Sequence, residues 1–589
     1  AWWDKREQLP ERFAELGLDP QAPRVEKWLA IAEALRGFPR HLTQHVGGFV
    51  ISRGPLARLV PVENAAMAER SVIQWDKDDL DAMGLMKVDI LALGMLSAIR
   101  RMLQMVDDGC GQQLKMQDIP AEDPATYEML CHADSMGVFQ VESRAQMAML
   151  PRLRPKNFYD LVVEVALVRP GPIQGDMVHP YLKRRQGKER LEKISPAVDA
   201  VLARTFGVPI FQEQVMQLAV VAANFTPGEA DQLRRAMAAW KRKGGLEPFE
   251  QKLLAGMAAN GLPESFARRI IAQIQGFGEY GFPESHAASF ALLVYASAWL
   301  KRHHPAAFLC ALLNSQPMGF YSPSMLIQDA RRHGVGVLAP DVVASDWDSR
   351  IDHSGAVRLG LREISGLSKA AADRIVAVDR KNRPFFDVAD LAARARLQRR
   401  DLDLLAAADA LLSLAGHRRQ AAWAASAAQV QGDLFAGTMV PEAPVSLSVP
   451  SEAENLLADY RHLKLTLRCH PLSLLREQLG ARRFVSAAEL KIAEHRTPIR
   501  TAGIVVGRQR PGTATGIVFV TLEDESGLTN VVVHPQLVER QRRELLGASM
   551  LGVYGQLQKE GDVVHLVAKR LVDLSSWLGK LETSSRDFH

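Results

Sequence analysis

The chain has 589 residues, of which 47% are hydrophobic, with 72 basic and 67 acidic side chains. It is long enough for several domains and apolar enough to fold them, which excludes general disorder. A net charge of +5 is too small to indicate nucleic-acid binding by itself.

Four scattered cysteines without a CxxC pair argue against structural zinc and disulfides and favour a reducing cytoplasm. No apolar run reaches the ~20 residues of a membrane span. Because the first residue is alanine, we expect that further residues precede it in the intact protein.

The predicted elements change character along the chain. Residues 1–40 have apolar positions at helical spacing, and residues 41–100 contain strand-like runs at 47–52, 72–75 and 86–90. Residues 101–345 are predicted to form one large helical domain. Residues 346–435 are predicted to form short helices, and 436–495 to form a linker and a small helical segment.

Residues 496–575 alternate between apolar and polar side chains. Five strands are predicted, with a helix at 536–546 between the third and the fourth, and residues 576–589 form a tail. This is the plan of an OB barrel, a module that commonly binds single-stranded nucleic acids.

Asp89 is an acidic residue in the otherwise apolar segment Leu85–Gly94. Its burial would need a cation, and a metal ion would supply one. Lys87 lies two residues away on the same strand face, where it is able to meet a phosphate. The alternative is that Asp89 caps a helix that begins at Ile90.

Thr226–Glu229 has the form of a capping box with proline at the first helical position. In the helix that follows, Arg234 and Arg235 recur seven residues later as Lys241 and Arg242. The resulting basic stripe suits a triphosphate, and the alternative is a solvated helix face.

Residues 276–281 match G-x-G-x-x-G literally, but a helical pattern precedes them and no βαβ unit follows. We therefore predict a hinge beside the start of a helix that runs from about 282 to 302, and no dinucleotide site. That helix start is able to face phosphate. His286 lies in its first turn, where it has either a structural role or a contact with a nucleotide.

The segment Ile364–Lys369 resembles the turn of a helix-hairpin-helix, whose backbone amides hold DNA phosphate without reading sequence. Its alternative is an ordinary helix-capping loop. Seven basic residues between 380 and 400 favour DNA. Farther on, Gln431–Phe435 places Leu434 and Phe435 where nothing around them predicts a core, as in a short docking peptide.

The order of these segments resembles the bacterial C-family DNA polymerases, the family of the DNA polymerase III α subunit. The resemblance covers almost the whole chain. Its motifs are Gln44–Gly48, Gln74–Lys77, Leu85–Leu96, Val138–Ser143, Ala166–Gln174, Phe211–Met216, Leu233–Met237 and Gly278–Ala288.

The resemblance implies the end of a thumb (1–40), the C-terminal part of a nucleotidyltransferase-like palm (41–100), fingers (101–345) and a helix-hairpin-helix domain (346–435), before the OB fold. It implies that Asp89 is the third metal carboxylate of a site with two Mg²⁺ ions. Lys87, Arg234, Arg235 and His286 are then nucleotide contacts.

The resemblance further implies that Ser365, Gly366, Leu367, Ser368 and Lys369 contact duplex DNA. It makes Gln431, Asp433, Leu434 and Phe435 the peptide that binds the sliding clamp. The second hairpin of the family falls near Asp409, which replaces a glycine and argues against a DNA contact there.

Within the family the chain is most similar to the error-prone, translesion branch, through Ala458–Arg461, Leu467–Pro471 and Arg508–Gly512. The implied activity is template-directed addition of dNTPs to a primer past DNA lesions, in the cytoplasm, with the clamp and other translesion proteins as partners. The other two carboxylates of the family form an Asp-x-Asp pair that this chain lacks, so we expect the isolated chain to be inactive. The alternative functions are a non-catalytic DNA-binding subunit and a clamp-docked adaptor of a lesion-bypass complex.

Overall fold

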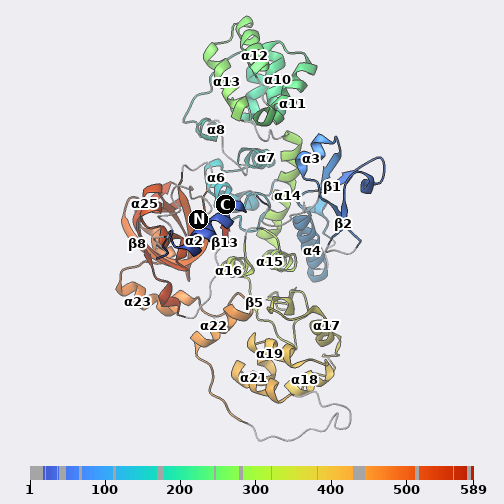
Figure 1. Cartoon of the computed structure of the whole chain (residues 1–589), viewed down its shortest axis with the longest axis vertical. Coiled ribbons are helices and arrows are strands. Elements are labelled where there is room, and N and C mark those ends of the chain that lie inside the picture. Colours follow the sequence, from blue (N-terminus) through green and yellow to red (C-terminus); the bar gives the residue numbers. More distant parts are fainter. Residues whose placement is uncertain are drawn as a thin grey trace. The chain divides into compact units, whose positions relative to one another are not determined.

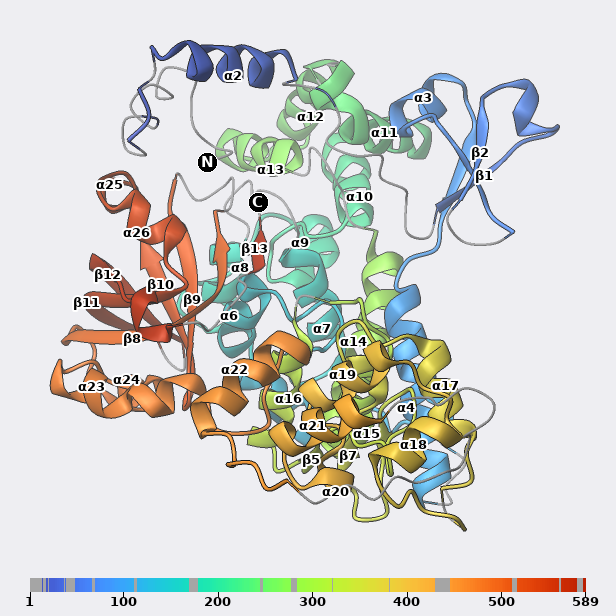
Figure 2. The same ribbon diagram turned by 60° about the horizontal axis from the view of Figure 1, so that its bottom comes forward.

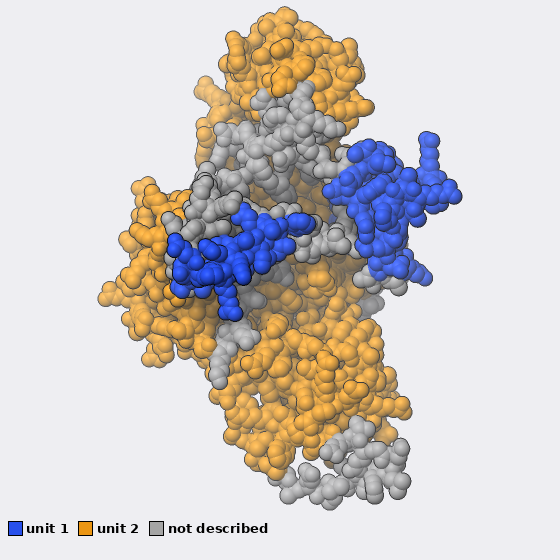
Figure 3. All heavy atoms as spheres, viewed as in Figure 1, with its two compact units in different colours: residues 1–93 blue, residues 94–589 orange. Residues whose placement is uncertain are grey.

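A computed structural model of the chain is shown in Figure 1 and, after a rotation, in Figure 2. The structure describes residues 13, 17–19, 21–35, 38, 48–65, 69–110, 114–168, 178–243, 247–276, 283–319, 321–380, 382–428, 445–510, 516–560, 563–579 and 586–588. The chain divides into two compact units, residues 1–93 and 94–589, which Figure 3 shows in two colours. Each unit is described by itself.

The described part of the first unit contains the helices α2 and α3 and two small antiparallel ribbons. Strand β1 pairs with β4, and β2 pairs with β3. The strand-like runs expected at 47–52, 72–75 and 86–90 are thereby confirmed, whereas helix α2 ends earlier than the expected end near Pro39. The bounds are α2 Pro23–Ala34, β1 Gly48–Ile51, β2 Val62–Asn64, β3 Ser71–Ile73, α3 Lys77–Ala82 and β4 Met86–Asp89.

The second unit begins with a long helical region, as expected. In helix α7 every side chain from Asp160 to Leu167 is buried. This helix packs along α14. The bounds are α4 Leu93–Cys110, α5 Pro124–Cys131, α6 Arg144–Leu153, α7 Phe158–Leu167, α8 Val178–Arg185, α14 Glu284–His303, α15 Pro305–Asn314 and α16 Pro323–Arg332.

Helices α9 to α13 share a separate hydrophobic core. Figure 1 shows α10 to α13 as one group of helices. Leu233 and Met237 from α11 pack there beside Leu218 from α10 and Met257 from α12. Helices α10 and α12 cross closely at Gly256, where an added Cβ would lie 2.2 Å from the carbonyl oxygen of Ala223. The bounds are α9 Pro196–Leu202, α10 Gln212–Ala223, α11 Pro227–Lys243, α12 Glu247–Ala259 and α13 Glu264–Gly276.

A group of short helices follows a three-stranded sheet of order β5-β7-β6. The helices agree with the sequence, whereas the sheet was not predicted because its strands have two residues each. The bounds are β5 Val337–Leu338, β6 Arg350–Ile351, β7 Val357–Arg358, α17 Lys369–Ala377, α18 Val388–Arg394, α19 Arg399–Ala407, α20 Leu412–Ala415, α21 Arg418–Ala427 and α22 Glu452–His462.

The C-terminal part is a closed five-stranded barrel, as predicted. Strand β11 pairs with both β12 and β8, and this second pairing closes the barrel. Leu490 of α24 and Leu537 and Leu545 of the helices between β10 and β11 join the core of the barrel. Figure 2 shows these helices at its two ends. The bounds are α23 Arg476–Ala481, α24 Ala487–Ile492, β8 Pro498–Gln509, β9 Val518–Asp524, β10 Gly527–Val533, α25 Pro535–Arg540, α26 Arg542–Gly547, β11 Met550–Glu560, β12 Val563–Asp573 and β13 Arg586–Phe588.

No helix in the described ranges is both long enough and apolar enough to cross a membrane.

Candidate nucleotide-binding and DNA-binding sites

Asp89 lies at the end of β4, opposite Gly48 of β1. Strand alternation puts Lys87 on the same face, and its Nζ atom lies 3.2 Å from Oδ1 of Asp89. The side chain of Asp89 is 38% exposed, so the expected burial of this carboxylate is not seen. Helix α4 begins at Leu93, so the alternative in which Asp89 caps a helix beginning at Ile90 is wrong.

A divalent cation fits Asp89 as one ligand among several. An exposed carboxylate is a hard oxygen donor of the kind that Mg²⁺ prefers, but octahedral coordination needs further oxygens. The nearby Asp76 accepts a hydrogen bond from the amide of Asp79 at 3.0 Å and so caps α3. Among the described residues, no group of three metal-ligand side chains includes Asp89.

Arg234 and Arg235 lie in α11, which begins at the predicted capping box. The amide of Thr226 donates to Glu229 at 2.9 Å, and the amide of Glu229 donates to Oγ1 of Thr226 at 3.3 Å. Both arginines form ion pairs with Asp231, at 2.9 and 2.8 Å. Their side chains are 39% and 74% exposed, so both are accessible to an anionic ligand that competes with this one carboxylate.

His286 lies in the first turn of α14, which begins at Glu284. Its ring is half-buried, with its centroid 4.4 Å from that of Phe290. The amide of Glu284 donates to the carboxylate of Glu213 at 3.0 Å. The carboxylate of Glu213 therefore already accepts a hydrogen bond from one of the amides at the start of α14. We expected these amides to be able to face phosphate. Most of the loop before this helix, residues 277–282, lies outside the described residues.

The turn Ser365–Lys369 joins a short 3₁₀ helix to α17. Gly366 has φ +85°, a conformation that favours glycine, and Oγ of Ser368 accepts from the amide of Ala371 at 3.1 Å. The amide of Ser365 donates to the carbonyl of His462 at 2.8 Å. Lys369 is exposed beside its ion-pair partner Asp373. The turn thus caps a helix, and it leaves Lys369 at the surface.

The basic residues near this turn fall into two groups. Three arginines form ion pairs with aspartates and also bond to backbone or side-chain oxygens: Arg380, Arg394 and Arg399. Three others are exposed and form no ion pair with a described residue: Arg383, Arg396 and Arg400. The exposed group is the part available to DNA phosphate.

Asp409 has φ +62°, and its carboxylate forms an ion pair with Arg468 at 2.8 Å. Its other oxygen is buried without a hydrogen bond. A carboxylate at this turn would repel phosphate, and the expectation that no DNA contact lies here stays a prediction.

The peptide Gln431–Phe435 lies outside the described residues. So do residues 169–174 of the motif Ala166–Gln174, and Lys381, one of the seven basic residues between 380 and 400. The side chains of Lys241 and Arg242 are also outside them.

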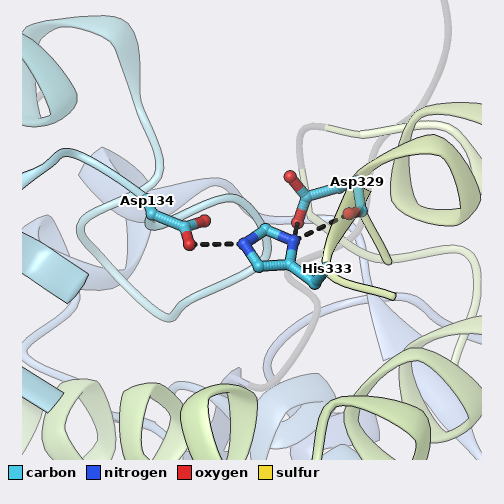
Figure 4. Close-up of side chains that lie close together, drawn as sticks. All are labelled: Asp134, Asp329 and His333. Carbon is cyan, nitrogen blue, oxygen red and sulfur yellow. Dashed lines mark hydrogen bonds and ion pairs between the residues drawn. The ribbon is translucent and has the colours of Figure 1, made fainter. Parts of the chain in front are cut away.

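A cluster of Asp134, Asp329 and His333 was not predicted from the sequence (Figure 4). Nε2 of His333 lies 2.6 Å from Asp134, and Nδ1 lies 2.7 Å from the backbone carbonyl of Asp329. The buried Lys301 donates to both carboxylates, at 2.7 and 2.9 Å. This ammonium already supplies the positive charge that two carboxylates need, so the cluster is an ionic network between elements far apart in sequence.

Comparisons with known families match the chain in four consecutive parts. Residues 2–92 match the bacterial DNA polymerase III alpha NTPase domain, and residues 95–261 match its finger domain. Residues 2–261 are thus similar to two consecutive domains of the bacterial DNA polymerase III alpha subunit. Residues 334–421 match a helix-hairpin-helix motif, and residues 499–574 match an OB-fold nucleic acid binding domain. The fold class predicted from the sequence is thereby confirmed.

Several proteins that are similar to this chain are named error-prone DNA polymerase. Those of Dechloromonas aromatica, Azoarcus sp. and Pseudomonas aeruginosa are 86%, 65% and 59% identical over the whole of this chain. The chain covers 57%, 56% and 57% of their lengths, so it spans little more than half of each relative.

Proposed function

We propose that the chain is the fingers, helix-hairpin-helix and OB part, with some of the palm, of an error-prone DNA-directed DNA polymerase. The observation that carries this proposal is the 86% identity over all 589 residues to a polymerase of that name. The four family matches in one order support it, because a lone motif would not specify the whole arrangement. The substrates are a primer-template and dNTPs, and the setting is synthesis past damaged template in the cytoplasm.

In this proposal Asp89 is one of at least three carboxylates that hold two Mg²⁺ ions. The ions would activate the primer hydroxyl and neutralise charge on the leaving pyrophosphate. Lys87 shares the strand face of Asp89, 3.2 Å away, and would exchange that partner for a phosphate oxygen. Arg234 and Arg235 would likewise leave Asp231 for the triphosphate, since guanidinium binds phosphate in a bidentate manner. We assign His286 a nucleotide contact on the resemblance alone.

The remaining domains would hold DNA without reading its sequence. The turn Ser365–Lys369 and the exposed Arg383, Arg396 and Arg400 would meet duplex phosphates. The segment Gln431–Phe435 would dock on the sliding clamp, and other translesion proteins would be further partners.

The assignment of Asp89 is tested in the full-length protein by Asp89→Asn, which keeps the shape of the side chain and removes its charge. We expect primer extension to fall by at least about 10³-fold, because a metal-binding carboxylate acts in the transition state. The affinity for primer-template should stay unchanged in a fluorescence anisotropy titration. Asp79→Asn, an exposed substitution in α3, is the matched control. Normal extension by Asp89→Asn would overturn the assignment.

A further inference from the structure

The outer face of the OB barrel carries a row of side chains that neither the sequence nor the family matches single out. Along β11, Leu551 and Val553 point into the core of the barrel. Met550 and Tyr554 point outward, onto a second apolar cluster formed with Phe484 and Leu574. Tyr554 is half-buried at the edge of this cluster.

Two arginines flank Tyr554 on the neighbouring strands. Tyr554 is in register with Arg500 of β8 and with Arg570 of β12. The guanidinium carbons lie 5.0 and 5.5 Å from the centroid of its ring, which is within the range of cation–π contacts. Three adjacent strands therefore present arginine, tyrosine and arginine side by side on one face.

The row continues onto the loop after α23 and the 3₁₀ helix after β12. Nη1 of Arg500 donates to the carbonyl of Arg482 at 3.1 Å, and the guanidinium of Arg482 lies 4.5 Å from the ring of Trp577. We call Trp577, Arg482, Arg500, Tyr554 and Arg570 the arginine–aromatic strip. Within the described part of the chain, its three arginines have no carboxylate within the 4.0 Å of an ion pair.

The face formed by β9 and β10 has a different character. In OB folds the second and third strands commonly bind nucleic acid, and here these are β9 and β10. Glu523 of β9 is nearly buried, 4.0 Å from His470, and Asp524 and Glu525 form ion pairs with Arg476. The segment that precedes the barrel therefore covers one end of this face and pairs with its acidic groups.

We propose that the arginine–aromatic strip binds single-stranded DNA, on a face of the barrel other than β9–β10. Bases stack on aromatic rings and on guanidinium planes, and guanidinium groups bind phosphates. Two aromatic rings among three arginines, which have no acidic partner within the described residues, provide both kinds of contact. An acidic peptide would need only the positive charges of the arginines. The proposal rests on the proposed function for the choice of DNA. Its test measures binding only, so a failed strip and a failed polymerase assignment are distinguishable.

The first test uses the complete 589-residue chain and a fluorescein-labelled oligothymidylate of about 20 nucleotides. The double variant Arg500→Gln/Arg570→Gln should bind about tenfold more weakly near 50 mM salt. It should also lower the slope of log K against log salt by about 1.4, the value for two lost phosphate contacts. Arg540→Gln/Arg543→Gln removes the same charge from α25 and α26 and should have little effect. Equal losses in the two double variants would overturn the proposal.

The second test separates stacking from charge. Tyr554→Leu keeps an apolar side chain at the edge of the outer cluster and should weaken binding at least about fivefold, while Tyr554→Phe should bind as the unaltered chain does. An oligonucleotide with 5-bromodeoxyuridine should form photo-crosslinks to peptides that contain Tyr554 or Trp577. Crosslinks confined to other segments, or full displacement of the oligonucleotide by polyglutamate of equal charge, would contradict single-stranded DNA as the ligand.

Discussion

His333 shows how one side chain joins distant parts of the second unit. Both of its ring nitrogens face oxygen acceptors, Asp134 at 2.6 Å and the carbonyl of Asp329 at 2.7 Å. An imidazole satisfies two acceptors only when both nitrogens carry protons. The hydrogen bond to Asp134 accordingly raises the pKa of His333 above 6.5. The pKa of Asp134 is lowered to about 2, because its bonds to His333 and Lys301 outweigh its desolvation.

These pKa shifts predict a pH-dependent stability. A histidine with a raised pKa contributes stability in full below its unfolded pKa near 6.5 and loses it as the pH rises through the folded pKa. Asp134 stays ionised throughout this range, since its pKa is about 2. We expect His333→Gln to lower the thermal midpoint at about pH 6, by the equivalent of about 1 kcal/mol after screening, and to have less effect at about pH 9. Scanning calorimetry measures both values. The exposed His353→Gln is the control, and an equal loss at both pH values would contradict the ionic role of His333.

At the scale of elements, a buried ion pair holds α22 against the helix-hairpin-helix region. Arg418 of α21 pairs with Asp459 of α22, and their side chains are 10% and 7% exposed. Arg418 also donates to Oδ1 of Asn455 at 2.7 Å and to the carbonyl of Ala407 at 2.9 Å. This guanidinium thus neutralises a buried carboxylate and satisfies two further acceptors.

Removal of Arg418 should be costly because it leaves the charge of Asp459 buried without its main partner. We expect Arg418→Ala to destabilise the protein by about 3–5 kcal/mol. The next residue is a matched control, since Arg419 pairs with Glu454 at the surface, where the side chains are 40% and 52% exposed. Arg419→Ala should cost less than about 1 kcal/mol. Urea unfolding measures the free energy of unfolding of both variants. An equal decrease in the two would show that the buried ion pair contributes no more to stability than the exposed one.

The elements that could be predicted from sequence are those with a strong local pattern. The barrel strands alternate regularly, with Val518, Val520 and Leu522 buried in turn, and Thr226 and Glu229 form a capping box that marks the start of α11. Strand β13 and the two-residue strands β5 to β7 are too short for any periodicity.

The side-chain partners of the candidate sites were not predictable in the same way. His333 and Asp134 are 199 residues apart, and Asp409 and Arg468 are 59 apart. Each of these pairs depends on packing between elements, which no local spacing reveals. Asp89 and Lys87 are the exception, since two positions on one strand share a face and their proximity follows from the sequence alone.

At the scale of the whole molecule, the first unit exposes much of its apolar surface. On the ribbon of β1 and β4, Phe49 is 47% exposed, Ile51 is 49% exposed and Met86 is 63% exposed. Trp28 in α2 is 57% exposed. Apolar side chains concentrated on one small ribbon indicate a surface that pairs with further protein. The chain covers 57% of the length of its Dechloromonas aromatica relative, which has additional residues that can provide this cover.

The partial coverage of the relatives also bears on the activity expected of this chain. Asp89 alone cannot hold two metal ions, and among the described residues no group of three possible metal ligands includes it. The isolated 589-residue chain should therefore bind primer-template but should not extend the primer when Mg²⁺ and dNTPs are supplied. Joining it to the unmatched part of the Dechloromonas aromatica polymerase, in the order of that relative, should restore extension in a gel-based assay. The joined protein with Asp89→Asn is the control and should remain inactive. Extension by the isolated chain at the rate of the joined protein would mean that its catalytic carboxylates are all within these 589 residues, and that Asp89 has other partners than we propose.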